Sequence, residues 1–220
     1  MPQTLAPVTR NLLIATILVY ALQLLLKDDT TAALTRYFAL WPLGPDVALR
    51  LDDGSVFTAG FRPWQVVTYA FMHGGLEHIL FNMFGLYMFG STVEHELGAR
   101  RFLIYYFTCL IVAGVAQLGV LYFFEPSRMF PTVGASGAIF GLLGAFAMRF
   151  PREKLMIIPI PIGIPAWLFV TAYGVIELVF GVTGTVAGVA HFAHLGGLAG
   201  GIVLMRLWRD KLPPRWRRGA

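Results

Sequence analysis

The stretch FPTVGASGAIFG, from Phe130 to Gly141, places a serine between glycines where a loop enters an apolar segment. Small residues in a membrane helix usually allow a neighbouring helix to approach closely. A serine flanked by glycines can also present a nucleophile at a tight turn. The short match Gly134-Ala135-Ser136-Gly137 favours packing when it is read alone, so its meaning depends on the rest of the chain.

The composition indicates an integral membrane protein. Of the 220 residues, 57% are hydrophobic and 13% are charged, whereas soluble domains carry about 25% charged residues. The net charge of +5 does not indicate nucleic-acid binding, because the basic residues cluster at the ends of apolar runs. The single cysteine, Cys109, excludes an internal disulfide.

Six apolar segments are candidates for membrane spans, which need about 20 apolar residues each. We expect one all-α membrane domain over residues 1–220, a bundle of six transmembrane helices with a water-accessible cavity open to the outer side. A long first loop occupies 28–63, and the prolines of 151–165 exclude a regular helix there. The expected spans are roughly 11–27, 68–90, 99–124, 136–150, 165–181 and 187–208.

The basic residues set the expected orientation. With six spans, all clusters fall on one side, which the positive-inside rule assigns to the cytoplasm together with both termini. These clusters are Arg10, Arg100 and Arg101, Arg149 with Arg152 and Lys154, and Arg206 with Arg209, Lys211, Arg215, Arg217 and Arg218.

Three of these spans then carry polar groups toward their outer ends. His78 and Asn82 are four residues apart and share one helix face, and His194 lies about two turns into the last span. The fourth span begins at Ser136 and covers only about 21 Å, so its outer end lies below the membrane surface. We therefore expect these groups to meet at one depth, where buried ionisable residues mark function.

Close helix packing would bring the serine to the histidine. Gly137, Gly141 and Gly144 follow one another along the fourth span, and Gly197 and Gly201 follow His194. Such small-residue faces let helix backbones approach closely. We expect spans four and six to contact each other through them.

This arrangement predicts covalent catalysis. A serine hydroxyl needs a base to take its proton, and we assign that role to His194 rather than to His191. His78, Asn82 and the backbone N–H of Ser136 are candidate donors to an oxyanion. No acidic residue has an obvious place beside His194, and Glu177 is expected in the outer interface. The interpretation is a Ser–His dyad.

The chain also resembles the rhomboid intramembrane serine proteases over nearly its full length. The motifs are His73-Gly-Gly-Leu-Glu-His78-Ile-Leu-Phe-Asn82, Gly134-Ala-Ser136-Gly137 and Ala193-His194-Leu-Gly-Gly197 with Gly201. The resemblance implies a bacterial, six-span member in the inner membrane.

It further implies hydrolysis of single-pass transmembrane proteins near their outer ends, within membrane lipid. Neither a metal ion nor another cofactor is expected. Ser136 would be the nucleophile, His194 the base, and His78 and Asn82 the oxyanion-hole donors. The supporting residues would be His73, Gly134, Gly137, Phe140, Gly197 and Gly201, and Glu94 with Arg100 or Arg101 matches a cytoplasmic Glu–Arg pair.

Two alternatives stay open. A catalytically inactive rhomboid-like protein would bind membrane clients, but such relatives lack the serine or the histidine. A small transporter would use the polar residues as a pathway, which leaves the Gly-Ala-Ser-Gly loop unexplained.

Overall fold

The computed structural model describes residues 4–208, except for 27–28, 51–53, 55, 128, 158–159 and 186–187. The basic tail after Arg206 and the charged residues Lys27, Asp28, Asp52 and Asp53 therefore lie outside the described residues. In chain order the elements are α1 (Pro7–Leu25), α2 (Asp29–Phe38), β1 (Val47–Arg50), β2 (Val56–Ala59), α3 (Gln65–Thr68), a 3₁₀ turn (Tyr69–Phe71), α4 (Leu76–Gly85), a π-helical turn (Leu86–Gly90), α5 (Ser91–Leu97), α6 (Ala99–Phe124), α7 (Ser136–Arg149), β3 (Lys154–Ile157), β4 (Ile160–Pro165), α8 (Ala166–Thr183) and α9 (His191–Trp208).

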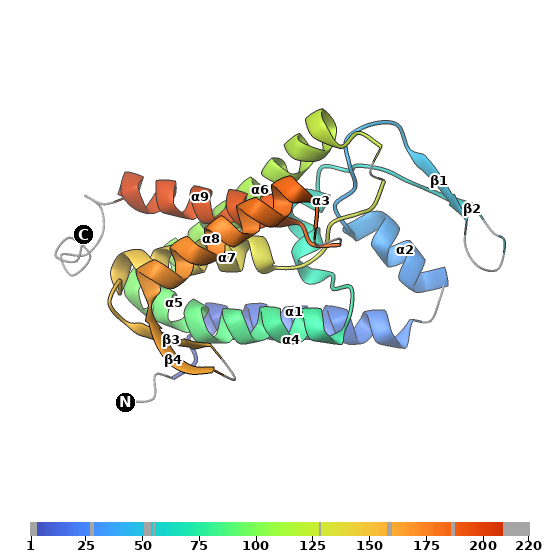
Figure 1. Cartoon of the computed structure of the whole chain (residues 1–220). Helices are drawn as coiled ribbons and strands as arrows, with labels where there is room; N and C mark the ends of the chain where they lie inside the picture. Colours follow the sequence, from blue (N-terminus) through green and yellow to red (C-terminus); the bar gives the residue numbers. More distant parts are fainter. Residues whose placement is uncertain are drawn as a thin grey trace.

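The chain is mostly helical, as predicted, and its helices form one bundle (Figure 1). Among the described residues, α1, α6 and α8 are long and apolar enough to cross a membrane, and α7 is a shorter apolar helix. The predicted spans at 99–124, 136–150 and 165–181 agree with α6, α7 and α8 to within two residues at each end. The last span was predicted to begin at 187, but α9 begins at His191.

The prediction of one continuous helix over 68–90 is wrong. Met72 is extended, with φ −87° and ψ 141°, and Gly75, also extended, precedes the first residue of α4. Glycine in a helix interior costs about 0.5–1 kcal/mol relative to alanine, so the Gly74-Gly75 pair favours a break. The helical backbone then runs without interruption over 76–97. His78 consequently lies in the first turn of its helix, not two turns in.

The two predicted loops contain short β-hairpins, which an all-α prediction missed. Strands β1 and β2 pair antiparallel, as do β3 and β4. Buried Gln65 organises the first of these segments: its side-chain oxygen accepts hydrogen bonds from the N–H groups of Trp41 (3.3 Å) and Arg62 (3.0 Å). Its amide nitrogen lies within 3.4 Å of three carbonyl oxygens, those of Arg36, Tyr37 and Gly60.

Helix α7 is the centre of the bundle. Eleven of its fourteen residues are buried, because α6, α8 and α9 all pack against it (Figure 1). Its contact with α9 is a backbone contact, since a Cβ on Gly197 would overlap the carbonyl oxygen of Gly137, and one on Gly201 would lie 3.0 Å from the Cα of Gly141. The predicted packing of the two glycine faces is therefore confirmed.

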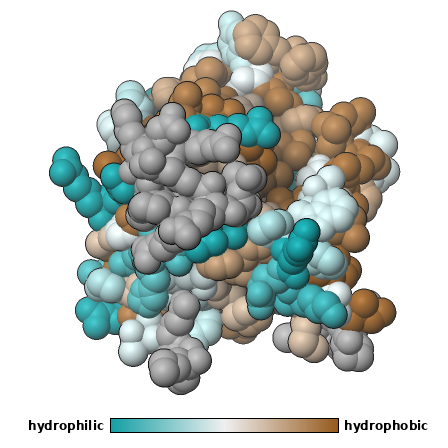
Figure 2. Space-filling model, turned by 90° about the vertical axis from the view of Figure 1, so that its left-hand side faces the viewer, coloured by the Kyte–Doolittle hydropathy of each residue, from teal (hydrophilic) through white to brown (hydrophobic). Residues whose placement is uncertain are grey.

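Most of the described basic side chains lie at one end of the bundle, whereas Arg36, Arg50 and Arg62 lie on or beside α2, β1 and β2. Helix α1 begins and α9 ends at the basic end, and the β3–β4 hairpin lies at the same end, while α2 and the β1–β2 hairpin lie at the opposite end (Figure 1). Figure 2 looks onto the first of these ends and shows hydrophilic side chains there, with hydrophobic surface beside them. Exposed arginines of this end are Arg10, Arg100, Arg101, Arg152 and Arg206.

Glu94 links α5 to the N-terminus of α1 at this end through hydrogen bonds. Its carboxylate accepts hydrogen bonds from the backbone N–H groups of Val8 (2.9 Å) and Thr9 (2.7 Å) and from the Thr9 hydroxyl (2.8 Å). A carboxylate at a helix N-terminus satisfies its unpaired N–H groups and complements the helix dipole. Arg100 and Arg101 are exposed, and an ion pair at this end joins Glu96 to Arg149 at 2.9 Å.

The glycine contact yields a stability prediction. Gly197→Ala should lower the free energy of unfolding by about 1–3 kcal/mol, because the added methyl group overpacks the α7–α9 contact. Gly119→Ala on α6 is the matched control, since a Cβ there meets nothing within 4 Å. It should be neutral or stabilising, by up to about 1 kcal/mol. Thermal unfolding in detergent measures both, and equal melting temperatures would contradict the contact.

Candidate active site

Ser136 is the first residue of α7, and the loop before it is fixed from two sides. The N–H of Gly134 donates to the carbonyl of Tyr69 at 2.9 Å, and Thr132 forms a two-way backbone bridge with Leu40 (3.0 and 2.8 Å). Gly134 has φ +112°, a left-handed conformation that side chains rarely adopt. The first N–H groups of a helix have no carbonyl partner within it, so they and the positive end of the helix dipole lie beside the hydroxyl.

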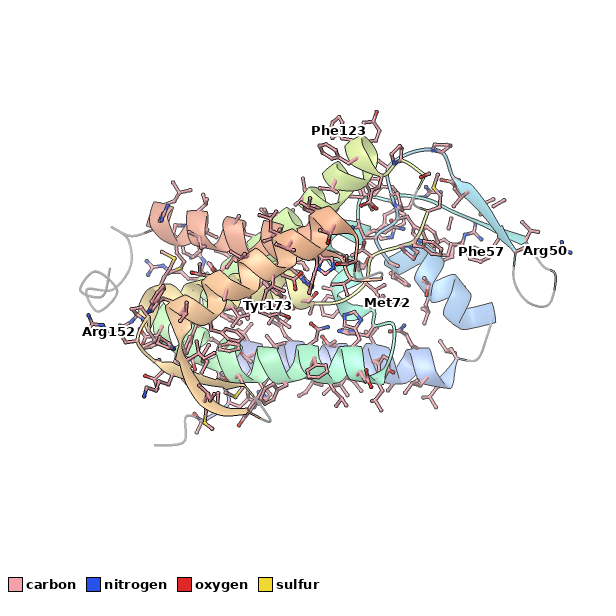
Figure 3. All side chains as sticks on the ribbon, viewed as in Figure 1. Arg50, Phe57, Met72, Phe123, Arg152 and Tyr173 are labelled. Atoms are coloured by element: carbon pink, nitrogen blue, oxygen red, sulfur yellow. The ribbon has the colours of Figure 1, made fainter. Side chains whose placement is uncertain are left out.

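His194 lies directly against this hydroxyl. Its Nε2 is 2.7 Å from the Ser136 Oγ, across the α7–α9 contact. The ring of Phe140 stacks on the imidazole, with centroids 4.4 Å apart and planes 5° apart. Tyr173, near the middle of the bundle in Figure 3, packs on Phe140 at 4.8 Å. These contacts restrict the rotation of the imidazole.

An acidic residue does lie beside His194, contrary to the sequence-based expectation. Glu177 on α8 is buried rather than at the outer interface, and its Oε2 is 2.9 Å from Nδ1 of His194 and 2.7 Å from Nδ1 of His191. A weak signal was present in the sequence. Gly174, Glu177 and Gly181 follow at three- and four-residue spacing on one face of α8, a small-residue face with a carboxylate at its centre.

His78 and Asn82 approach the serine loop from α4. A Cβ on Gly134 would overlap the Nε2 of His78 and lie 3.5 Å from the Nδ2 of Asn82. The N–H of Gly74 makes a long, 3.5 Å hydrogen bond to Nδ1 of His78, which assigns the ring proton to Nε2. Asn82 Nδ2 donates one hydrogen to the carbonyl of His78 at 3.0 Å, and the amide carries a second. Both side chains thus offer N–H groups near Gly134.

His73 supports this side of the site. It is buried, and its ring meets that of His78 edge to face, with centroids 5.0 Å apart. Among the described residues, neither of its ring nitrogens has a hydrogen-bond partner. Its backbone is held by Gln23, which accepts from the His73 N–H (3.1 Å) and donates to its carbonyl (3.2 Å). No sequence pattern indicated this role for Gln23.

A cavity of about 470 Å³ adjoins His191. It lies beside the ends of α6 and α8 and the start of α9 and has mostly apolar walls, with Gln117, Glu125 and His191 as its polar lining residues. Glu177, His191 and His194 also have potential metal-ligand atoms within 4.8 Å of one another. In this arrangement those atoms hydrogen-bond to each other.

The comparisons with known proteins give the family. The Rhomboid domain family matches residues 60–211. The chain is 33% identical over 156 residues to the rhomboid protease GluP of Bacillus subtilis. The aligned region covers 70% of this chain and 28% of GluP. The chain is 31% identical to the putative rhomboid protease YdcA of the same organism, over 70% of this chain and 71% of that one.

A yeast mitochondrial relative, Rhomboid protein 1, is 30% identical over 63% of this chain and 40% of its own length. The chain thus spans well under half of GluP and of the yeast protein. Because the family match extends over more than half of the chain, the protein is an integral membrane protein that belongs to the rhomboid family.

Proposed function

We propose that the protein is an intramembrane serine endopeptidase that cleaves single-pass transmembrane proteins near the outer face of the membrane. The 2.7 Å hydrogen bond between Ser136 Oγ and His194 Nε2 carries this proposal. It lies at the N-terminus of a buried helix, where unpaired N–H groups can stabilise negative charge. Relatives named as rhomboid proteases support it.

The reaction follows from these positions. Ser136 Oγ attacks the peptide carbonyl carbon while its proton moves to Nε2 of His194. The resulting oxyanion accepts hydrogen bonds from His78 Nε2, from Asn82 Nδ2 and from the backbone N–H of Ser136. When the C–N bond breaks, His194 gives its proton to the leaving amine. A water molecule then hydrolyses the acyl-enzyme, with His194 again taking a proton.

Of the alternatives, the inactive client-binding protein is less consistent with this geometry, because nothing in client binding requires a hydroxyl and an imidazole to share a hydrogen bond. The transporter leaves unexplained why His78 and Asn82 present N–H groups beside the serine loop. Neither alternative needs the stacked Phe140 ring.

The membrane arrangement is also a proposal. Six spans would be α1, the broken segment ending in α4 and α5, and α6 to α9, with both termini in the cytoplasm of a bacterium. Among the described residues, the excess of exposed arginines at one end of the bundle, five against Arg50 at the other, supports this orientation. The cavity beside His191, at the ends of α6 and α8, would supply water from the outer side.

Orientation can be tested with reporter fusions. Fusions after Glu94 and after Lys154 should report the cytoplasm, because both residues lie in the basic end of the bundle. A fusion at Gly54, in the β1–β2 connection, is the opposing control and should report the outer side. An outer-side signal at Glu94 or Lys154 would contradict the orientation.

The nucleophile can be tested in purified enzyme reconstituted in lipid. Ser136→Ala should abolish cleavage of a reporter transmembrane protein and leave the melting temperature nearly unchanged, because it removes one hydroxyl and opens little space. Ser127→Ala, the same change at an exposed loop position, should retain activity. Cleavage by Ser136→Ala well above a no-enzyme reaction would remove this residue from the role.

Asn82 should act on the chemical step. Asn82→Ala is expected to lower kcat by about 10²–10³-fold, the usual cost of losing one oxyanion donor, with little change in KM. The control Thr171→Ala removes a hydroxyl that bonds only its own helix, to Trp167 O. Steady-state kinetics separates the two parameters, and a large rise in KM at unchanged kcat would indicate substrate positioning instead.

A further inference from the structure

Glu177 is a buried carboxylate that no part of a two-residue mechanism requires. Its residue is 4% exposed, and those of His191 and His194 are 6% and 9% exposed. A buried carboxylate is costly unless hydrogen bonds or opposite charge compensate it. Here one oxygen, Oε2, takes both imidazole Nδ1 atoms as partners, at 2.7 and 2.9 Å.

These contacts assign the protons. An ionised carboxylate only accepts hydrogen bonds, so both Nδ1 atoms must carry hydrogen. A neutral imidazole has one N–H, and for His194 this leaves Nε2 with a free lone pair facing the Ser136 hydroxyl at 2.7 Å. Glu177 thereby selects the tautomer in which His194 can act as a base.

The backbone is arranged to bring this carboxylate to α9. On α8, a Cβ at Gly181 would lie 3.1 Å from the ring of Phe192 and 3.2 Å from the Cβ of His191, and one at Gly174 would lie 3.3 Å from Leu198. Both glycines share the face of Glu177. The absence of side chains at the turns before and after Glu177 lets α8 approach α9 closely at its level.

We propose that Glu177 is a positioning residue for the base. The site then works as a Glu177–His194–Ser136 triad, in which His191 is a second hydrogen-bond donor to the carboxylate. This rests on the proposed protease function. When the serine proton reaches Nε2, the Nδ1 proton stays on His194 and the ionised Glu177 balances the new positive charge. The N–H of His191 holds Oε2 in place. It also partly stabilises the negative charge of Glu177 before His194 receives the serine proton.

The test compares variants of the full-length enzyme in lipid. Glu177→Gln keeps the shape and removes the charge, and we expect kcat to fall by roughly 10⁴-fold, as for loss of the acidic member of other serine-protease triads, with KM unchanged. His191→Gln should lower kcat less than Glu177→Gln does. Glu153→Gln, the same change at an exposed position, should match wild type.

Reaction of Ser136 with a fluorophosphonate gives a readout that is independent of substrate binding. Labelling should slow in Glu177→Gln in parallel with kcat, while melting temperature reports folding separately. Glu177→Asp provides a second variant if Glu177→Gln does not fold, and it should retain more kcat than Glu177→Ala. Wild-type kcat and labelling in Glu177→Gln, or equal activities of the Asp and Ala variants, would overturn the proposal.

Two controls distinguish the role of Glu177 from the protease function itself and from metal binding. Wild-type enzyme that neither cleaves nor labels at Ser136 would refute the proposed protease function, whereas an active wild type with an unimpaired Glu177→Gln would refute only the role of Glu177. EDTA should leave activity unchanged. Loss of activity in EDTA, restored by added Zn²⁺, would show that Glu177, His191 and His194 hold a metal ion. This result would also overturn the proposed triad.

Discussion

The backbone contact between α7 and α9 is the constraint on which the site depends. The carbonyl of Gly137 lies against Gly197 with no room for a Cβ between them. Because Ser136 precedes the first glycine and His194 lies three residues before the second, this contact fixes the relative position of nucleophile and base. The packing of α6, α8 and α9 around α7 buries it almost completely, so the serine sits on a rigid element and not on a mobile loop.

Polar groups in such an interior need partners, and the bundle supplies them through a few hydrogen bonds between distant segments. Tyr105, buried on α6, donates to the carbonyl of Gly141 at 2.7 Å, and Tyr69 donates to that of Leu110 at 2.9 Å. Each phenol donates to a carbonyl of a helix other than its own. Glu94 likewise joins α5 to α1, and Gln65 connects α3 to the segments before and after the first hairpin.

The sequence predicted the helical segments well where glycine and proline were absent from their interiors or were accommodated by close packing. Helix α6 has no proline and matches its predicted bounds. The failure occurred where local chemistry interrupts an apolar run, because Gly74-Gly75 breaks the second span. The described part of 151–165 contains no helix, as predicted, and forms a hairpin. Hydropathy cannot detect such breaks, because glycine and proline change backbone geometry with little effect on mean hydropathy.

By itself the sequence determined the membrane class from composition and the glycine faces from spacing along each helix. It also predicted the pairing of Ser136 with His194, which lie on different helices, from the close packing expected between those glycine faces. Only the tertiary structure decided the place of Glu177. Its neighbours His191 and His194 lie on another helix, and an apolar helix with one acid is equally consistent with an interfacial residue. Which of its faces turns inward depends on how Gly174 and Gly181 pack against α9, a contact that the spacing of these residues along α8 indicates only weakly.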